Sequence, residues 1–240
     1  NVANVMLVLG TAALLGARSE GGEDVRRDSV AVIVATAFMA VFVFGGEVPL
    51  SGGVVMLSCL IAYYYYTYSK AIAGDDEYEF EDSWLPRKMS AAIPACIIGG
   101  GMIWLGAILL VDGSTNIAET FGVSEAVIGL TIVALGTSLP ELAVTVVAGL
   151  RGQGGVAVGN VLGSNVMNIM GIISIASIFG GGILVDSEFT RDILVVIATS
   201  GFVVIAFLRG KDFSRPVGSL MILTYVSYMT YLSGILNGLV

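Results

Sequence analysis

Long apolar stretches without basic residues or aspartate alternate with short charged segments along the chain. Most approach the ~20 residues that an α-helix needs to cross the hydrocarbon core of a bilayer. Glu141 is the only glutamate in them. The pattern therefore predicts eight helix-sized segments, at residues 1–17, 29–46, 48–69, 89–111, 126–150, 152–185, 193–208 and 216–240.

The composition points to the same class of protein. Hydrophobic residues make up 56% of the 240 residues and charged residues 12%, whereas soluble domains carry about 25% charged residues. None of the apolar stretches alternates in the way that is typical of barrel strands. Since only helices and closed barrels satisfy their backbone groups in lipid, we predict an all-α integral membrane protein.

The basic residues predict how the helices cross the membrane. If successive stretches alternate in direction, Arg191 alone falls on one side and all other Lys and Arg residues fall on the other. An excess of Lys and Arg is typical of cytoplasmic loops. We therefore expect a multi-pass protein of the cell (inner) membrane, with cytoplasmic loops at residues 18–28, 70–88, 151–155 and 209–215.

Two parts of the sequence resemble each other at a spacing of 164 residues. Residues 1–6 (Asn-Val-Ala-Asn-Val-Met) align with residues 165–170 (Asn-Val-Met-Asn-Ile-Met), and Arg27-Asp28 aligns with Arg191-Asp192. Apolar composition alone does not explain polar matches inside or beside hydrophobic segments. We interpret the two parts as internal repeats.

The repeat divides the chain into three parts. Residues 1–70 form the C-terminal part of a first repeat with three helices, residues 71–88 an acidic cytoplasmic linker, and residues 89–240 a complete second repeat with five. By extrapolation, the first repeat would begin about 75 residues, or two helices, before Asn1. An odd number of helices per repeat gives the two copies opposite orientations, which is the inverted-repeat architecture of secondary transporters.

One ionisable side chain lies deep inside an apolar stretch. Glu141 is the only charged residue in residues 126–150, and a carboxylate at membrane depth costs roughly 3 kcal/mol. Ala134, Thr137 and Ser138 precede it at spacings that place all four residues on one helix face. A structural alternative is that Glu141 is a neutral carboxylic acid hydrogen-bonded to a neighbouring helix.

The same helix is weakened just before the glutamate. Pro140 has no N–H, so the carbonyl of Gly136 loses its helical partner. The helix thus offers a carboxylate, two hydroxyls and freed carbonyls in one small volume. These are hard oxygen ligands, suited to Na⁺ or Ca²⁺ and poorly suited to zinc or copper.

The next apolar stretch carries a stripe of polar residues. Asn160, Ser164 and Asn168 follow one another at helical spacing, with Asn165 beside Ser164. Asn4 is the repeat equivalent of Asn168, so we expect it to approach the same centre from the opposite side. For Asn160 and Asn165 the alternative is a structural role, in which the amides hold neighbouring helices together.

These two segments together resemble a known family, the prokaryotic-type sodium/calcium exchangers of the cation/calcium antiporter superfamily. The resemblance implies an all-α fold of ten helices in two inverted halves of five, with about eight helices in this chain. It further implies a secondary active antiporter that is not an enzyme and uses no cofactor. The segments similar to the second alpha-repeat are Gly136-Thr137-Ser138-Leu139-Pro140-Glu141 and Gly159-Asn160-Val161-Leu162-Gly163-Ser164-Asn165, and residues 1–16 resemble the tail of the first.

The resemblance implies roles for residues at matching positions. Glu141 would be the central carboxylate shared by transported Ca²⁺ and Na⁺. A second acidic ligand is expected in the part of the first repeat before Asn1. Potassium-transporting members tend to have Asp in place of Asn168, which argues for potassium independence. The remaining ligands would be oxygens of Thr137, Ser138, Ser164, Asn168 and Asn4, and the backbone carbonyl of Ala134.

We therefore expect exchange of Na⁺ for Ca²⁺ by alternating access at a midplane site. The helix at 89–111 would move against the bundle, and its glycines at 99–101 and 106 would let it slide closely over its neighbours. The alternative is a Ca²⁺/H⁺ or other cation/proton exchanger. The expected partners are the two ions and the lipid bilayer and no nucleic acid, and a monomer is compatible with the sequence.

Overall fold

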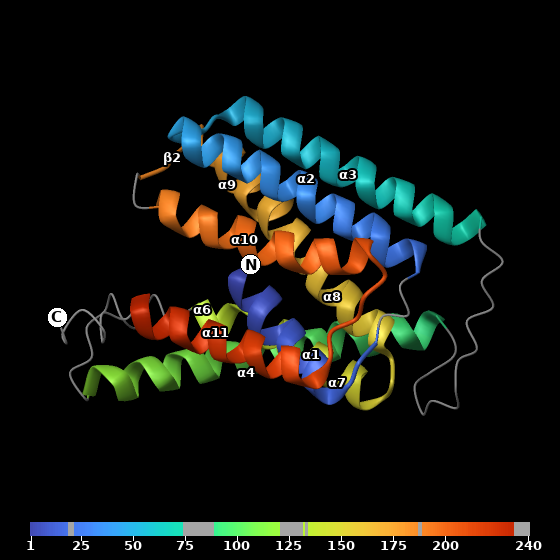
Figure 1. The fold of residues 1–240 in the computed structure, drawn as a ribbon. Helices are drawn as coiled ribbons and strands as arrows, with labels where there is room; N and C mark the ends of the chain where they lie inside the picture. The colour runs from blue at the N-terminus through green and yellow to red at the C-terminus, as the bar shows by residue number, and fades with distance from the viewer. Residues whose placement is uncertain (19–21, 74–88, 121–131, 133, 187–188, 233–240) are drawn as a thin grey trace.

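The protein is described by a computed structural model that covers residues 1–18, 22–73, 89–120, 132, 134–186 and 189–232 (Figure 1). Within these ranges, five helices are long and apolar enough to cross a membrane, and two shorter apolar helices span Asn4–Leu15 and Leu139–Leu150. The predicted all-α membrane fold is thus confirmed. In chain order the elements are η1 (Asn4–Val8), α1 (Leu9–Leu15), α2 (Glu23–Gly45), β1 (Glu47–Val48), α3 (Leu50–Ala73), α4 (Met89–Thr120), α6 (Ala134–Thr137), α7 (Leu139–Leu150), α8 (Gly154–Val166), η3 (Met167–Ile173), α9 (Ser174–Gly180), β2 (Ile183–Leu184), α10 (Phe189–Leu208) and α11 (Arg215–Leu232).

Several helices are longer than the charge-free stretches predicted. Helix α2 begins at Glu23, before the predicted start at residue 29, and α4 continues to Thr120, past residue 111. The absence of charge marks only the part of a helix that lies in hydrocarbon. Beyond it the backbone stays helical, and Glu23 and Asp24 in the first turn of α2 interact favourably with the helix dipole.

The two repeats are interleaved. Figure 1 shows one layer with α2, α3, α9 and α10 and another with α1, α4, α7 and α11, while α8 runs between them. Helices α2 and α10 pack against each other, as do α1 with α11 and α3 with α9. Each layer therefore combines helices from both sequence repeats, and buried side chains such as Leu9, Val32 and Leu162 form the common core.

A short sheet joins the repeats at one end of the bundle. Strands β1 and β2 pair antiparallel, with Glu47 opposite Leu184 and Val48 opposite Ile183. The sequence analysis missed these strands because two residues are too few to show a periodicity of two.

The same distortion occurs at the same place in both repeats. Asn4 opens the π-helix η1, and its repeat equivalent Asn168 lies in the π-helix η3. Single π-helical turns inside α-helices occur frequently at functional sites. The two repeats therefore share the same backbone distortion at the two asparagines that the sequence marks as candidate ligands.

A carboxylate–tyrosine hydrogen bond is also repeated. The Tyr63 hydroxyl donates to Asp28 Oδ1 at 2.8 Å, joining α3 to α2. The Tyr228 hydroxyl donates to Asp192 Oδ1 at 3.0 Å, joining α11 to α10. Asp28 and Asp192 are the aspartates of the two aligned Arg-Asp pairs, so each repeat joins its last two helices with the same bond.

Small residues allow two matched helix crossings. A Cβ atom at Gly218 would lie 2.5 Å from the carbonyl oxygen of Gly10, where α11 crosses α1. A Cβ atom at Gly53 would lie 2.9 Å from the carbonyl oxygen of Ser174, where α3 crosses α9. In the repeat, Gly10 corresponds to Ser174, so both crossings require a residue without a side chain on the final helix.

The loops that carry most of the basic residues lie at one end of the bundle, which agrees with the charge pattern of the sequence. The start of α2, the end of α3 and the connection from α10 to α11 all lie at the right-hand end of the bundle in Figure 1. Helix α10, which carries Arg191 near its start, begins at the opposite end. The assignment of the first end to the cytoplasm stays a prediction.

Candidate cation-binding site

The helix that carries Glu141 is interrupted. Helix α6 ends at Thr137, Ser138 forms a turn, and α7 starts at Leu139 with Pro140 in its first turn. The amide N–H of Leu142 donates to the Ser138 carbonyl at 2.9 Å. Pro140 was expected inside one helix, whereas it lies in the first turn of α7 after a one-residue interruption at Ser138, whose backbone stays in the right-handed helical region. Proline is tolerated without strain at a helix start.

Glu141 lies at the start of α7, where the helix packs against α8 and η1. Its Oε2 atom is buried and has no hydrogen-bond partner among the described atoms. Buried polar atoms are almost always paired in native proteins. An unpaired carboxylate oxygen next to a helix break is therefore available to a ligand.

Asn160 has a structural role. Its Nδ2 atom donates to the Glu141 carbonyl oxygen at 3.1 Å and to Thr145 Oγ1 at 3.0 Å. These bonds join α8 to α7 at the residue that carries the carboxylate. The interhelical role that the sequence analysis held open for Asn160 fits this geometry.

Asn1 connects the two repeats. Its Nδ2 atom donates to the Asn165 carbonyl at 3.2 Å, and its Oδ1 atom accepts from Asn168 Nδ2 at 3.2 Å. Asn1, Asn165 and Asn168 therefore lie together, and α7, which carries Glu141, packs against α8 and η1 beside them.

Two buried asparagines add unpaired polar atoms. Asn4 and Asn165 are each 1% exposed. Neither Oδ1 atom has a hydrogen-bond partner among the described residues, and nor does Asn165 Nδ2. With Glu141 Oε2 this gives three buried acceptor oxygens without a donor, contributed by both repeats.

The other predicted ligands differ in exposure and in hydrogen bonding. Ser164 Oγ donates to the Asn160 carbonyl one turn earlier in α8 at 2.8 Å, which leaves its lone pairs free. Ser138 is 6% exposed, whereas Thr137 is exposed. Ala134 is the first residue of α6. No cluster of three Asp, Glu, Cys or His side chains occurs in the described ranges.

A cavity of about 240 Å³ leads from this neighbourhood to the start of α10. Asn1 and Asn168 line it together with Asp192, Phe189 and Ile173. The sequence analysis used Asp192 only as evidence for the repeat and missed its place in the cavity. Its position in the first turn of an apolar helix was the available signal.

Helix α4 contacts the interrupted helix at Gly136. A Cβ atom at Gly136 would collide with Val111 Cγ2, so α4 and α6 pack with no space for a side chain. The glycines at 99–101 and 106 behave differently, since a Cβ atom there would meet no described atom within 4 Å. The sliding contact expected at those four glycines stays a prediction, whereas the tight contact that is observed depends on a glycine of the partner helix.

Comparison with known sequences agrees with this arrangement. Residues 92–234 match the family described as sodium/calcium exchanger protein. The putative antiporter CaxA of Alkalimonas amylolytica is 30% identical, over 95% of this chain and 74% of the relative. The inner membrane protein YrbG of Escherichia coli K12 is 30% identical, over 98% and 76%. The sodium/calcium exchanger MaX1 of Methanosarcina acetivorans is 36% identical, over 57% and 39%.

The fold is also similar to solved structures. The sodium-calcium exchanger NCX_Mj soaked with Na⁺ and Sr²⁺ matches with a TM-score of 0.77 and 28% sequence identity, over 95% of this chain and 73% of the exchanger. The family model thus matches more than half of the chain, and relatives are matched over about three quarters of their own length. The inverted-repeat fold is shared with a solved exchanger. The chain belongs to the sodium/calcium exchanger family.

Proposed function

We propose that this protein is a secondary active antiporter that exchanges Na⁺ for Ca²⁺ across the cell (inner) membrane by alternating access. One observation carries the proposal. The buried Oε2 of Glu141 has no described partner at the helix interruption, and Asn4 of the opposite repeat contributes another buried, unpaired oxygen from η1, which packs against α7. Membership of a family of transporters is consistent with the expectation that the chain is not an enzyme.

The cation would be held by oxygen atoms from both repeats. Glu141 supplies a negative charge in a membrane interior, where neutral oxygens alone would bind a divalent ion weakly. Ca²⁺ takes six to eight oxygen ligands, which is more than one helix break can provide. We assign the ligands to Glu141, Thr137, Ser138, Ser164, Asn168 and Asn4, with the backbone carbonyl of Ala134.

Exchange follows if both ions use the same oxygens. Na⁺ and Ca²⁺ have similar radii and both prefer hard ligands, so occupancy by one excludes the other. If the site must hold an ion before it can change the side of the membrane to which it is open, each Ca²⁺ carried in one direction requires Na⁺ to be carried in the other. The cavity that Asp192 shares with Asn1 and Asn168 would be the route on the outer side of the membrane.

The division into repeats belongs to the same proposal. Residues 1–70 would contribute Asn4, residues 89–240 would contribute Glu141 and the other ligands, and residues 71–88 would connect the two on the cytoplasmic side. Most of this linker lies outside the described residues. The matched π-helices at Asn4 and Asn168 support a site shared between oppositely oriented halves.

A second candidate is Ca²⁺/H⁺ or other cation/proton exchange, because Glu141 could carry a proton in place of Na⁺. Purified full-length protein in proteoliposomes separates the two functions. We expect an outward Na⁺ gradient to drive Ca²⁺ uptake at equal internal and external pH. Uptake that ignores the Na⁺ gradient and follows an imposed pH gradient would replace the first function with the second.

A further inference from the structure

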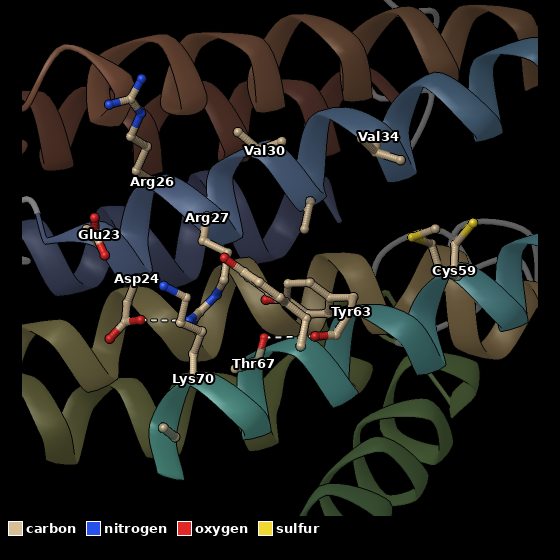
Figure 2. Close-up of a pocket in the computed structure, with 14 residues that line it drawn as sticks. Glu23, Asp24, Arg26, Arg27, Val30, Val34, Cys59, Tyr63, Thr67 and Lys70 are labelled. Atoms are coloured by element: carbon tan, nitrogen blue, oxygen red, sulfur yellow. Dashed lines mark hydrogen bonds and ion pairs between the residues drawn. The ribbon is translucent and has the colours of Figure 1, made fainter. Parts of the chain in front are cut away.

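A large groove separates α2 and α3 at the end of the bundle that carries the basic loops. Its volume is about 1300 Å³, and Met170 of η3 contributes to its wall. Figure 2 shows Val34 and Cys59 at one end of the groove, and Asp24 and Lys70 at the other. The groove is therefore apolar along its length and charged at its mouth.

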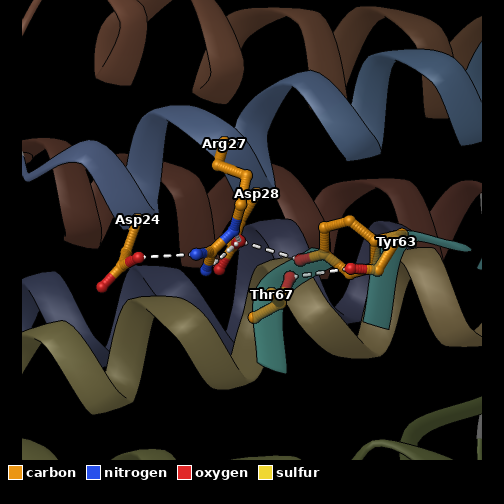
Figure 3. A network of polar contacts seen from close by, with 5 residues as sticks. All are labelled: Asp24, Arg27, Asp28, Tyr63 and Thr67. Carbon is orange, nitrogen blue, oxygen red and sulfur yellow. Dashed lines mark hydrogen bonds and ion pairs between the residues drawn. The ribbon is translucent and has the colours of Figure 1, made fainter. Parts of the chain in front are cut away.

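One cation at the mouth is already paired. Arg27 contacts Asp24 at 2.6 Å and Asp28 at 2.8 Å, and Tyr63 donates to the same Asp28 oxygen. Figure 3 shows this network extending from the start of α2 to Tyr63 on α3. The guanidinium of Arg27 lies between two carboxylates of its own helix, so its positive charge is already paired.

Three other charged side chains line the mouth. These are Arg26, Lys70 and Glu23, and none of them forms an ion pair with another described residue. The formal charges of these three and of the Arg27 network sum to zero. A ligand that fits this mouth carries both a negative and a positive group and has no net charge.

The position of the groove restricts what that ligand is. The helices span a membrane, and Tyr63 and Tyr66 lie in the second half of α3, toward the basic loops. Aromatic residues are enriched at the boundary between lipid and water. A phospholipid presents an acyl chain to the apolar part and its headgroup to the mouth. An anionic headgroup would satisfy Arg26 and Lys70 but would place extra negative charge beside Glu23 and Asp24.

We propose that this groove binds a zwitterionic phospholipid with a primary ammonium headgroup, of the phosphatidylethanolamine class, from the cytoplasmic leaflet. The phosphate pairs with Arg26 and Lys70. The ammonium donates hydrogen bonds to Glu23 and Asp24, which a quaternary ammonium cannot do. The acyl chain lies along Val30, Val34 and Cys59.

The repeat provides an internal comparison. At the spacing of 164 residues, Thr190 takes the place of Arg26 and Arg191 takes the place of Arg27. The equivalent position between α10 and α11 therefore lacks the free cation on its first helix. This difference places the lipid on the cytoplasmic side.

Native mass spectrometry of the purified full-length protein tests the proposal. The protein is incubated with equal amounts of phosphatidylethanolamine, phosphatidylcholine and phosphatidylglycerol that carry identical acyl chains. We expect phosphatidylethanolamine adducts to dominate, and the double variant R26Q/K70Q to lose them by at least about tenfold. Lys211→Gln serves as the matched control, because Lys211 is exposed, lies at the same end of the bundle and does not line the groove.

Both substituted side chains are exposed, so the thermal unfolding temperature of the double variant should stay close to that of the native protein. Three results would overturn the proposal. These are preferential binding of phosphatidylglycerol, equal binding of phosphatidylcholine and phosphatidylethanolamine, and an equal loss of adducts in the Lys211→Gln control.

Discussion

Asn168 Nδ2 lies 3.2 Å from Asn1 Oδ1, and this hydrogen bond joins residues 167 positions apart in the chain. Asn1 also donates to the Asn165 carbonyl at 3.2 Å. The first repeat is thus fixed to the polar stripe of the second. The contact joins η3, which contains Asn168, to the segment directly before η1, the matching π-helix of the oppositely oriented half.

The first prediction concerns the carboxylate. Glu141→Gln keeps the size of the side chain and removes its charge. Removing one partner of a buried charge pair costs about 3–5 kcal/mol, so we expect Na⁺-driven Ca²⁺ uptake to fall by roughly two orders of magnitude or more. Radiolabelled Ca²⁺ flux into proteoliposomes measures this, at equal amounts of reconstituted protein.

Glu119→Gln is the matched control for that experiment. Glu119 is exposed on α4, so the same chemical change should leave uptake unaltered. If Glu141→Gln retains native exchange while its thermal unfolding is unchanged, the carboxylate does not bind the transported ions.

The second prediction separates a structural asparagine from a ligand. Asn160→Ala removes hydrogen bonds to the Glu141 carbonyl and to Thr145 Oγ1, and Thr145 is completely buried. Each lost bond costs about 0.5–1.5 kcal/mol. We therefore expect a lower thermal unfolding temperature and only a small change in Ca²⁺ affinity. Asn168→Ala should give the opposite pattern, with affinity reduced more than stability.

Calorimetric Ca²⁺ titration and thermal unfolding of both variants in the same detergent provide the comparison. A large loss of affinity in Asn160→Ala at native stability would instead make Asn160 a ligand.

The third prediction uses the repeated carboxylate–tyrosine bond. Tyr63→Phe and Tyr228→Phe each remove a hydroxyl that donates to an aspartate, and hydrogen bonds to charged groups contribute about 1.5–3 kcal/mol. Both variants should unfold at lower temperature. Because the two bonds join different helix pairs in different repeats, the losses in the double variant should be additive.

Tyr65→Phe controls for the loss of a hydroxyl, since Tyr65 is 73% exposed and should tolerate the change. Strongly non-additive losses would mean that the two helix pairs are coupled over a longer range than their contacts suggest.

Much of this fold can be predicted from the sequence because lipid allows few alternatives. Apolar stretches of fixed length have to become helices, and the aligned Asn and Arg-Asp pairs identify the repeat. Gly136 and Pro140 predict a weakened helix, although they do not specify that the interruption falls at the single residue Ser138. A local pattern contains no information about distant partners, so the pairing of Asn1 with Asn165 and Asn168 could not be predicted.

Two other placements also depend on distant partners. Glycine in a membrane helix allows close approach but does not specify where a neighbour lies. The glycines of α4 face no described atom, whereas Gly136 of α6 receives Val111. Asp192 was recognised as a repeated residue, but its place beside Asn168 in a cavity depends on how α10 packs across the repeat boundary.

The last prediction tests the matched helix crossings. Gly218→Ala places a methyl group 2.5 Å from the Gly10 carbonyl oxygen, and Gly53→Ala places one 2.9 Å from the Ser174 carbonyl oxygen. Neither backbone oxygen can move without displacing its helix, and overpacking of this kind costs about 1–3 kcal/mol.

Gly201→Ala in α10 is the control, because an added Cβ there meets nothing within 4 Å of the described chain. Alanine also favours the helix over glycine by about 1 kcal/mol. We therefore expect thermal unfolding temperatures to fall for Gly218→Ala and Gly53→Ala, more for the former, and to hold or rise for Gly201→Ala. Equal shifts in all three variants would mean that helix propensity, and not the crossing distance, determines stability at these positions.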